Sequence, residues 1–247
     1  MPQPVVASRL PAVNQVHAIS ERAAHVRDRI CRAAEAVGRD PAAVEILPVT
    51  KGHSAEKVAE VIAAGFDRIG ENRAAEAEAK REVLAGLDVR WHMVGHVQTN
   101  KAARVVRTFD MVESVDSIRL ARRLSETCEK AGRAPLSVLV QVNASGEAAK
   151  GGFAAAAALE PISEICAMPG LTVRGIMTMA PFVDEPGLLR SVFRRARTLF
   201  DRCGESVTGF TAEVLSMGMS NDFELAVEEG STELRLGTIL VGERPGR

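Results

Sequence analysis

The chain has 247 residues, of which 46% are hydrophobic, and its 31 Lys and Arg residues nearly balance its 32 Asp and Glu residues. The formal net charge of −1 argues against nucleic acid as a main partner, because nucleic-acid-binding domains usually carry a basic excess. No apolar run reaches the length of a membrane-spanning helix, and the N-terminus lacks the features of a signal peptide. We therefore expect a cytoplasmic protein without a membrane partner.

The cysteines are scattered and form no Cys-x-x-Cys pair: Cys31, Cys128, Cys166 and Cys203. A structural zinc site is therefore not expected, and the sequence predicts no other metal site. Each cysteine lies in a helical pattern beside apolar residues, which predicts buried, reduced thiols. Reduced thiols fit a reducing cytoplasm.

Helical and strand-like segments alternate along the chain after a loose tail over residues 1–12. The first helix is expected over Val13–Val37 and is closed by Gly38. The later helices are expected, in chain order, over Ala55–Ala64, Ala74–Leu84, Gln98–Arg107, Ser117–Ala131, Ala154–Met168, Pro186–Cys203 and Asp222–Glu229. The strands between them are expected over Val44–Thr50, Arg68–Gly70, Val89–Val94, Met111–Val115, Leu136–Val142, Leu171–Met177, Thr211–Met217 and Glu233–Val241.

This alternation predicts an α/β fold with parallel strands and right-handed crossovers. In a chain of this length it favours a single closed (β/α)8 TIM-type barrel with an extra N-terminal helix, in one domain over residues 1–247. An open doubly wound sheet is the alternative. It is disfavoured because no Gly-x-Gly-x-x-Gly motif follows the first strand.

A candidate anion site lies where the seventh strand passes into the next helix. The small residues Ser216, Gly218 and Ser220 occupy this junction, and Asn221 or Asp222 can cap the helix that follows. The start of a helix offers unpaired N–H groups and a positive dipole end, which suit a phosphate.

Lys51 closes the apolar first strand and is expected at the barrel mouth, where sites of this fold lie. Partial desolvation there would lower the pKa of its amine and favour a Schiff base with a carbonyl compound. From position alone, a lysine that reaches out of the barrel rim is the simpler interpretation. The anion site favours the Schiff base, because a carbonyl compound with a phosphate group would satisfy both ends.

Other strand-end residues each allow two interpretations. Arg235 either forms a structural ion pair or donates to a ring atom of a ligand. Gly237 either occupies a tight strand position or, with Thr238, offers backbone N–H groups to the same ligand. Asn72 is either a helix cap or a polar contact of the site. His92, a lone histidine on a strand, is more typical of a hydrogen-bonded core residue.

A series of short motifs carries a family resemblance. They are VTK at Val49–Lys51, GEN at Gly70–Asn72, WHMVGHVQTNK at Trp91–Lys101, VN at Val142-Asn143, KGGF at Lys150–Phe153, GIMTM at Gly175–Met179 and LSMGMSNDFELAVEEGSTELRLGT at Leu215–Thr238. Over about residues 13 to 244, the chain resembles the pyridoxal phosphate homeostasis proteins, which are single-domain barrels related to the N-terminal domain of alanine racemase. The order of the motifs and the length of the last one make the combination specific.

The resemblance implies that the cofactor is pyridoxal 5′-phosphate (PLP). It implies that Lys51 holds PLP as an aldimine and that Ser220 binds the phosphate. Gly237 and Thr238 fall on the other side of the same phosphate site. Lys150 lies in a Gly-rich loop that could close over the ligand.

The resemblance also implies that Arg235 faces the pyridine nitrogen, that Asn72 lies near the cofactor, and that Met219 and Met177 line the ring. The chain departs from the family pattern in two places. It lacks an aromatic residue in GENRAAE at Gly70–Glu76, and it lacks two more in the C-terminal ILVGERPGR.

These residues favour a carrier over an enzyme. Arg235 stays protonated and cannot give the ring nitrogen a proton, which makes PLP a poorer electron sink. The related racemases use a tyrosine from a second domain, whereas this chain has no tyrosine and a short C-terminus. The resemblance therefore implies a monomeric, non-catalytic protein that contributes to intracellular PLP, vitamin B6 and amino-acid homeostasis. The alternatives are a weak PLP-dependent racemase or other Schiff-base enzyme, and a module that passes PLP to apo PLP-dependent enzymes.

Overall fold

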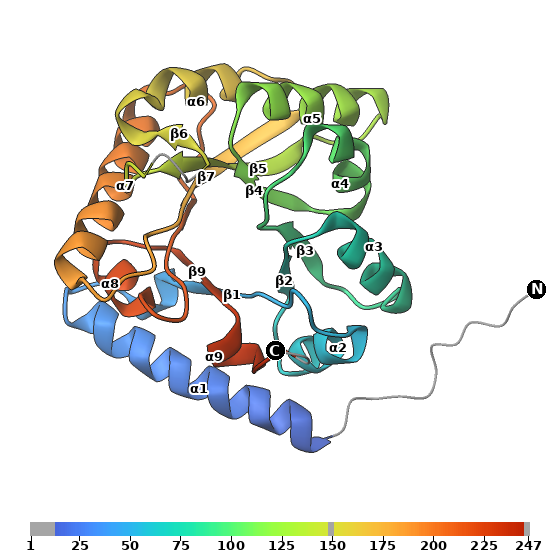
Figure 1. Cartoon of the computed structure of the whole chain (residues 1–247), viewed down its shortest axis with the longest axis vertical. Coiled ribbons are helices and arrows are strands. Elements are labelled where there is room, and N and C mark those ends of the chain that lie inside the picture. Colours follow the sequence, from blue (N-terminus) through green and yellow to red (C-terminus); the bar gives the residue numbers. More distant parts are fainter. Residues whose placement is uncertain (1–12, 148–150, 245–247) are drawn as a thin grey trace, which may run out of the picture.

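The computed structural model describes residues 13–147 and 151–244 and shows a parallel barrel surrounded by helices (Figure 1). The strands are β1 (Glu45–Pro48), β2 (Arg68–Glu71), β3 (Arg90–Met93), β4 (Met111–Val115), β5 (Leu136–Asn143), β6 (Phe153–Ala154), β7 (Leu171–Thr178), β8 (Val214–Ser216) and β9 (Glu233–Leu236). The ring runs in the order β1-β9-β8-β7-β5-β4-β3-β2, and β6 pairs with β5 off this path. A bridge between Val49 and Gly70 joins β1 to β2 and closes the ring.

The predicted barrel with an N-terminal helix is therefore confirmed, and the open-sheet alternative is wrong. The helices are α1 (Val13–Glu35), α2 (Ala55–Ala63), α3 (Ala74–Val83), α4 (Ala102–Thr108), α5 (Ile118–Lys130), α6 (Leu159–Cys166), α7 (Pro186–Ser206), α8 (Phe223–Glu228) and α9 (Thr238–Val241). Short 3-10 turns lie at Pro41–Ala43, Thr99–Lys101 and Ala155–Ala157. Helix α1 runs along the outside of the barrel against α2, α8 and α9 (Figure 1). The predicted tail over residues 1–12 and Lys150 lie outside the described residues.

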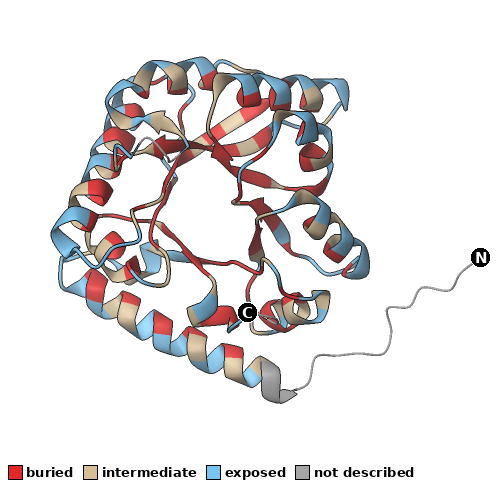
Figure 2. Ribbon diagram, in the orientation of Figure 1, coloured by how far each residue is buried: buried red, intermediate tan, exposed pale blue. Residues whose placement is uncertain are grey.

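The main hydrophobic core lies between the barrel and its helices, and buried positions follow the strands and the inner faces of the helices (Figure 2). Val112 and Val138 belong to this core. Since successive side chains of a strand point to opposite faces, their neighbours Met111 and Leu139 face the barrel interior. There they form a separate small cluster with Met177. The barrel interior also holds buried polar residues, which lie beneath the site described below: His92, Glu113, Ser216, Glu233 and Arg235.

The last predicted strand, Glu233–Val241, is wrong in its second half. Strand β9 ends at Leu236, and Thr238–Val241 forms α9 instead. The backbone of Gly237 turns sharply between them, with φ −99° and ψ −100°. A short apolar run such as TILV suits a strand or a buried helical turn equally well, so periodicity could not separate the two.

The predicted helix over Ala154–Met168 begins later than expected. Residues Phe153–Ala154 form β6, a 3-10 turn follows, and α6 starts at Leu159. Pro161 explains the boundary, because a proline is tolerated in the first turn of a helix and not in its interior.

The cysteines are all free thiols. Cys128 and Cys203 are buried as predicted, but Cys31 and Cys166 are only half-buried, so the prediction of buried thiols is wrong for those two. Desolvation raises the pKa of Cys166 and of Cys203 to about 11, which keeps both thiols protonated at neutral pH. Among the described residues, no helix is long and apolar enough to cross a membrane.

Candidate functional site

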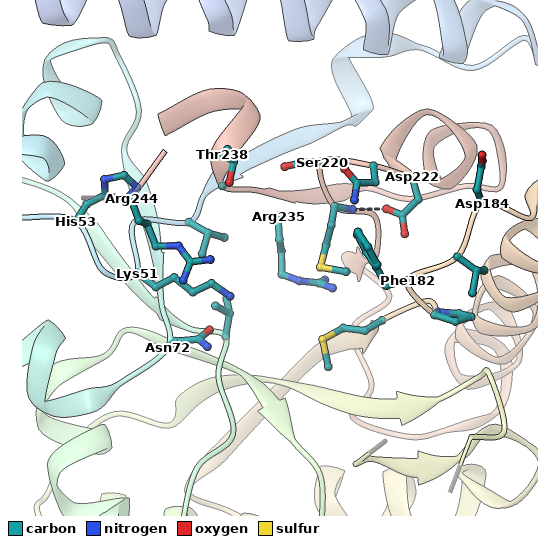
Figure 3. A pocket seen from close by; sticks show the side chains of 18 residues that line it. Lys51, His53, Asn72, Phe182, Asp184, Ser220, Asp222, Arg235, Thr238 and Arg244 are labelled. Carbon is teal, nitrogen blue, oxygen red and sulfur yellow. Dashed lines mark hydrogen bonds between the residues drawn. The ribbon is translucent and has the colours of Figure 1, made fainter. Parts of the chain in front are cut away.

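A cavity of about 700 Å³ opens at the mouth of the barrel, where the C-terminal ends of the strands meet (Figure 3). Of the eight residues that the sequence analysis places around a cofactor, all but Met177 line this cavity: Lys51, Asn72, Met219, Ser220, Arg235, Gly237 and Thr238. They come from β1, β2, β8 and β9 or from the loops that follow these strands. The barrel therefore brings together residues that lie up to 187 positions apart (238 − 51) in the sequence.

Lys51 follows β1, and its half-buried side chain extends into the cavity (Figure 3). The strand end that carries it is tied to both neighbouring strands. Val49 N donates to Leu236 O at 2.8 Å, and Thr50 N donates to Gly70 O at 2.9 Å. The backbone that precedes Lys51 is thus hydrogen-bonded to strands on both sides, which helps to place the amine as a nucleophile requires.

A second lysine, Lys80 on α3, lies behind this strand end and is 6% exposed. Its Nζ donates to the backbone carbonyl of Thr50 at 3.0 Å and to the carboxylates of Glu71 and Glu76 at 2.7 Å each. Thr50 immediately precedes Lys51. The Lys80 ammonium therefore holds the backbone from which the Lys51 side chain projects.

The two acidic partners of Lys80 also bind the residues on either side of Lys51. Gly52 N donates to Glu76 Oε1 at 2.7 Å, and the Thr50 hydroxyl donates to Glu71 Oε1 at 2.6 Å. Burial raises the pKa of Glu71, and Lys80 and Thr50 oppose this rise. The second oxygen of Glu71 has no hydrogen-bond partner among the described residues.

Arg235 reaches into the middle of the cavity from β9 and is 5% exposed (Figure 3). One Nη donates to Ser216 Oγ at 2.7 Å and the other to the carbonyl of Thr178 at 2.8 Å. Burial lowers the pKa of Arg235, and the charges of Glu113 and Glu233 oppose this effect. A guanidinium nevertheless stays protonated, so Arg235 presents a fixed cation to the cavity.

Ser216 does not belong to the anion site in which the sequence placed it. The Ser216 side chain is fully buried in the barrel interior, where its hydroxyl donates to Glu113 Oε2 at 2.9 Å. Glu113 Oε1 lies 2.8 Å from His92 Nδ1. His92 is thus a buried, hydrogen-bonded histidine, as predicted. We call His92, Glu113, Ser216, Glu233 and Arg235 the interior polar cluster.

The interior polar cluster contains one set of metal-type donors. His92, Glu113 and Glu233 each place one ligand atom within 4.8 Å of the others. Glu113 is already bonded to His92 and Ser216, and the Arg235 guanidinium adds a positive charge beside the carboxylates. These contacts favour a hydrogen-bonded network over a cation, and the absence of a metal site stays a prediction.

The phosphate side of the predicted site lies at one end of the cavity, where Ser220 and Thr238 appear together (Figure 3). Thr238 is the first residue of α9, and the first N–H groups of a helix have no acceptor inside it. These N–H groups and the Ser220 hydroxyl can donate hydrogen bonds to a bound anion. Asp222 occupies the cap position directly before α8, as predicted, but its side chain makes no capping hydrogen bond to the helix. Its carboxylate instead accepts a hydrogen bond from Met219 N at 2.6 Å.

Asn72 is placed by a close approach of two loops. A Cβ atom at Gly95 would lie 2.3 Å from the carbonyl oxygen of Asn72, so only glycine fits at position 95. Met177, which the resemblance placed beside the ring, is buried in the barrel interior and does not line the cavity. Met179, two residues later, takes that position.

Sequence reasoning missed several lining residues. The most important is Arg244, a further cation that lies beside Lys51 and His53 (Figure 3). Its only sequence signal is a positive charge shortly after the last strand. The loop of residues 181–184 also lines the cavity, and Phe182 on this loop is 86% exposed. A loop with no regular periodicity gives no sequence signal for its position.

Comparisons with known proteins show the family of the chain. The model of the family "Alanine racemase, N-terminal domain" matches residues 23–245. A pyridoxal phosphate homeostasis protein from Pseudomonas aeruginosa is 41% identical over 226 residues, which cover 92% of this chain and 96% of that protein. The chain belongs to the pyridoxal phosphate homeostasis protein family. The resemblance stated from the motifs is thus confirmed.

Two solved structures place the family in a wider fold group. PipY of Synechococcus elongatus, with PLP bound, has a TM-score of 0.79 and 34% identity, and the match covers 91% of this chain and 100% of that one. Alanine racemase from Clostridium difficile has a TM-score of 0.72 at 17% identity, which shows a common fold, and the match covers 95% of this chain and 58% of the racemase.

Proposed function

We propose that the chain binds PLP through Lys51 and contributes to intracellular PLP, vitamin B6 and amino-acid homeostasis as a carrier rather than an enzyme. The observation that carries the proposal is the cavity in which Lys51, Arg235 and the Ser220–Thr238 end converge. A family relative of the same fold with PLP bound supports it further. When bound, PLP supplies an aldehyde that condenses with a primary amine.

The donor set fits the three parts of this cofactor. Lys51 offers the amine, and the rigid end of β1 keeps it in place. Ser220 and the start of α9 offer neutral donors for the phosphate, and Arg244 adds a positive charge. Arg235 lines the same cavity and can donate to a ring nitrogen. Asn72 and Met219 complete the lining around the ring.

Two features support a carrier without substantial turnover. Arg235 is fixed by Ser216 and by the carbonyl of Thr178, so it can hold a hydrogen bond to a ring nitrogen but cannot transfer a proton to it. The sequence contains no tyrosine, the side chain that the related racemases use as an acid–base group. Rapid deuterium exchange at the α-carbon of added amino acids would argue for the enzyme alternative.

We further propose a single domain over residues 1–247, because all the described strands except β6 form one ring, and β6 pairs with β5 of that ring. The free thiols support a location in a reducing cytoplasm.

Two further parts of the proposal are a monomeric state and the transfer of PLP to apo PLP-dependent enzymes. Sedimentation velocity tests the first, and activation of an apo-enzyme by the loaded protein in the presence of a PLP scavenger tests the second.

The binding proposal is tested by absorption spectroscopy of the purified protein with added PLP. We expect a visible band from the PLP–lysine linkage in the wild-type protein and in Lys130→Ala, which removes an exposed lysine at the end of α5. Lys51→Ala should lack this band while keeping the same thermal midpoint. Equal bands in Lys51→Ala and the wild type would reject Lys51 as the attachment site.

A further inference from the structure

Glu233 lies directly beneath Arg235 in the barrel. The two residues are separated by one position on β9, so their side chains project from the same face of the strand into the interior. Arg235 reaches the cavity, whereas Glu233 is 2% exposed and does not line it. The carboxylate of Glu233 lies within 4.8 Å of ligand atoms of both His92 and Glu113.

The hydrogen bonds of the interior polar cluster leave Glu233 short of donors. The Ser216 hydroxyl donates to Glu113 Oε2 at 2.9 Å, accepts from Arg235 and also acts on the Glu233 carboxylate, so several groups share it. Glu233 Oε1 has no hydrogen-bond partner among the described residues. A buried carboxylate oxygen without a donor is costly when charged, and a bound proton removes that charge.

The net effect of burial and of the charges around Glu233 also favours the protonated carboxyl group. The groups that act on it are Glu113 from β4, His92 from β3, Arg235 from β9 itself and Arg68 from β2. Glu45 of β1, its register partner, is exposed and lies 3.8 Å from Arg68. Burial and the negative charge of Glu113 raise the pKa of Glu233 to about 7, against the opposing effects of His92, of the Ser216 hydroxyl and of Arg235.

The pKa values of the other two titratable groups are shifted towards their charged forms. Burial alone would lower the pKa of His92, but the hydrogen bond and the charge of Glu113 raise it above its usual value. Burial alone would raise the pKa of Glu113, but His92 and Arg235 hold it below its usual range. Whatever charge His92 carries, release of the Glu233 proton removes one unit of positive charge from the interior polar cluster, next to the guanidinium of Arg235.

We propose that Glu233 holds an exchangeable proton inside the barrel and that its release reduces the positive charge that Arg235 presents to the cavity. Glu233 is then a positioning residue that acts through Arg235. Its effect on a ligand rests on the proposed function, in which Arg235 contacts the ring of an anionic cofactor. Under that function, release of the Glu233 proton weakens PLP binding on the order of tenfold.

The proton itself is tested on the protein without PLP. Infrared difference spectra between pH 5 and pH 9 should show the C=O stretch of a buried protonated carboxyl that disappears around neutral pH. The band should be absent in Glu233→Gln and unchanged in Glu205→Gln, which alters an exposed glutamate on α7. The absence of such a band in the wild type, or its persistence in Glu233→Gln, would overturn the proposal.

The link to Arg235 is tested by PLP titrations of the same three proteins at pH 6 and pH 8.5. Glutamine copies the protonated form, so Glu233→Gln should bind PLP at pH 8.5 more tightly than the wild type does, on the order of tenfold. Equal pH dependence in the wild type and Glu233→Gln would contradict the link. No binding to the wild type at either pH would reject the proposed function, and the infrared result would still show whether Glu233 holds a proton.

Metal binding is a separate test. Binding of Zn²⁺ or Mn²⁺ alone that requires Glu233 would make the interior polar cluster a metal site and would also overturn the proposal.

Discussion

Lys80 Nζ donates a 3.0 Å hydrogen bond to the backbone carbonyl of Thr50, the residue directly before Lys51. A buried cation thus fixes the main chain that carries the cavity lysine. The same ammonium lies 2.7 Å from Glu71 and 2.7 Å from Glu76, so its charge is compensated without reaching solvent. The backbone next to Lys51 is therefore held by this arrangement as well as by the barrel strand.

Replacing Lys80 by methionine should therefore disturb both stability and the site. The change leaves Glu71 as a buried charge without its partner, and loss of one member of a buried pair costs about 3–5 kcal/mol. We expect the free energy of unfolding in urea to fall by about this amount, with weaker PLP binding at temperatures where the variant is folded. The exposed control Lys130→Met should change the free energy of unfolding by less than about 0.5 kcal/mol. Wild-type stability in Lys80→Met would show that this ammonium is not required.

Arg244 should contribute to binding mainly through the phosphate of PLP, because it adds a positive charge to the cavity and the phosphate is the most highly charged group of the cofactor. A hydrogen bond to a charged group is worth about 1.5–3 kcal/mol. We expect Arg244→Gln to weaken PLP about tenfold or more and to leave the affinity for pyridoxal, which lacks the phosphate, unchanged. Fluorescence titrations with both compounds make this measurement, with the surface variant Arg195→Gln as control. An equal loss for both compounds would place Arg244 away from the phosphate.

Gly218 should tolerate no side chain. Its φ is +99°, and a Cβ atom there would lie 2.6 Å from Ala226 Cβ and 2.9 Å from Leu234 Cδ2. We expect Gly218→Ala to lower the free energy of unfolding by about 2–4 kcal/mol, from backbone strain together with overpacking. Its carbonyl also accepts from Arg235 N at 3.1 Å, so PLP binding should weaken as well.

The matched control for this change is Gly187→Ala on α7. An added Cβ there meets no atom within 4 Å, and alanine favours the helix by up to about 1 kcal/mol. Thermal denaturation should therefore separate the two alanine variants in opposite directions. Similar midpoints for both would contradict the packing at Gly218.

The interior polar cluster predicts a specific dependence of stability on pH. The pKa of Glu233 is about 7 in the folded protein, above the ordinary value of 4.5. The folded state therefore binds this proton more tightly than the unfolded state. Its stabilising effect is complete below pH 4.5 and is lost as the pH rises to about 7. Denaturant unfolding should show Glu233→Gln gaining stability relative to the wild type over this range, and a constant difference would contradict the shifted pKa.

Most of the fold could be predicted from the sequence because its local signals agree. Apolar, β-branched strands alternate with amphipathic helices that end at residues such as Gly38 and Gly65. The seven predicted cofactor-binding residues line one cavity because they lie in or shortly after the C-terminal parts of strands, and parallel strands bring these ends to one face. Their individual roles stay predictions.

The remainder depends on contacts that are distant in the sequence. Ser216 looks like part of an anion loop by its neighbours, but the pleat of β8 turns it towards Glu113, which lies 103 positions away. Arg244 gives no pattern because a loop places it. The pairing of Glu113 with Glu233 is equally invisible, since each alone reads as a polar residue near a strand end. These contacts form only when the strands close into a barrel, so the local sequence around each residue does not predict them.

The most direct test of the central claim is to locate PLP on the chain. The protein is mixed with one equivalent of PLP, reduced with borohydride, digested and mapped by mass spectrometry. We predict that the wild type carries a single adduct on Lys51 and that the exposed-lysine control Lys130→Ala carries the same adduct. An adduct spread over several lysines, or an equal yield of adduct in Lys51→Ala, would contradict the account.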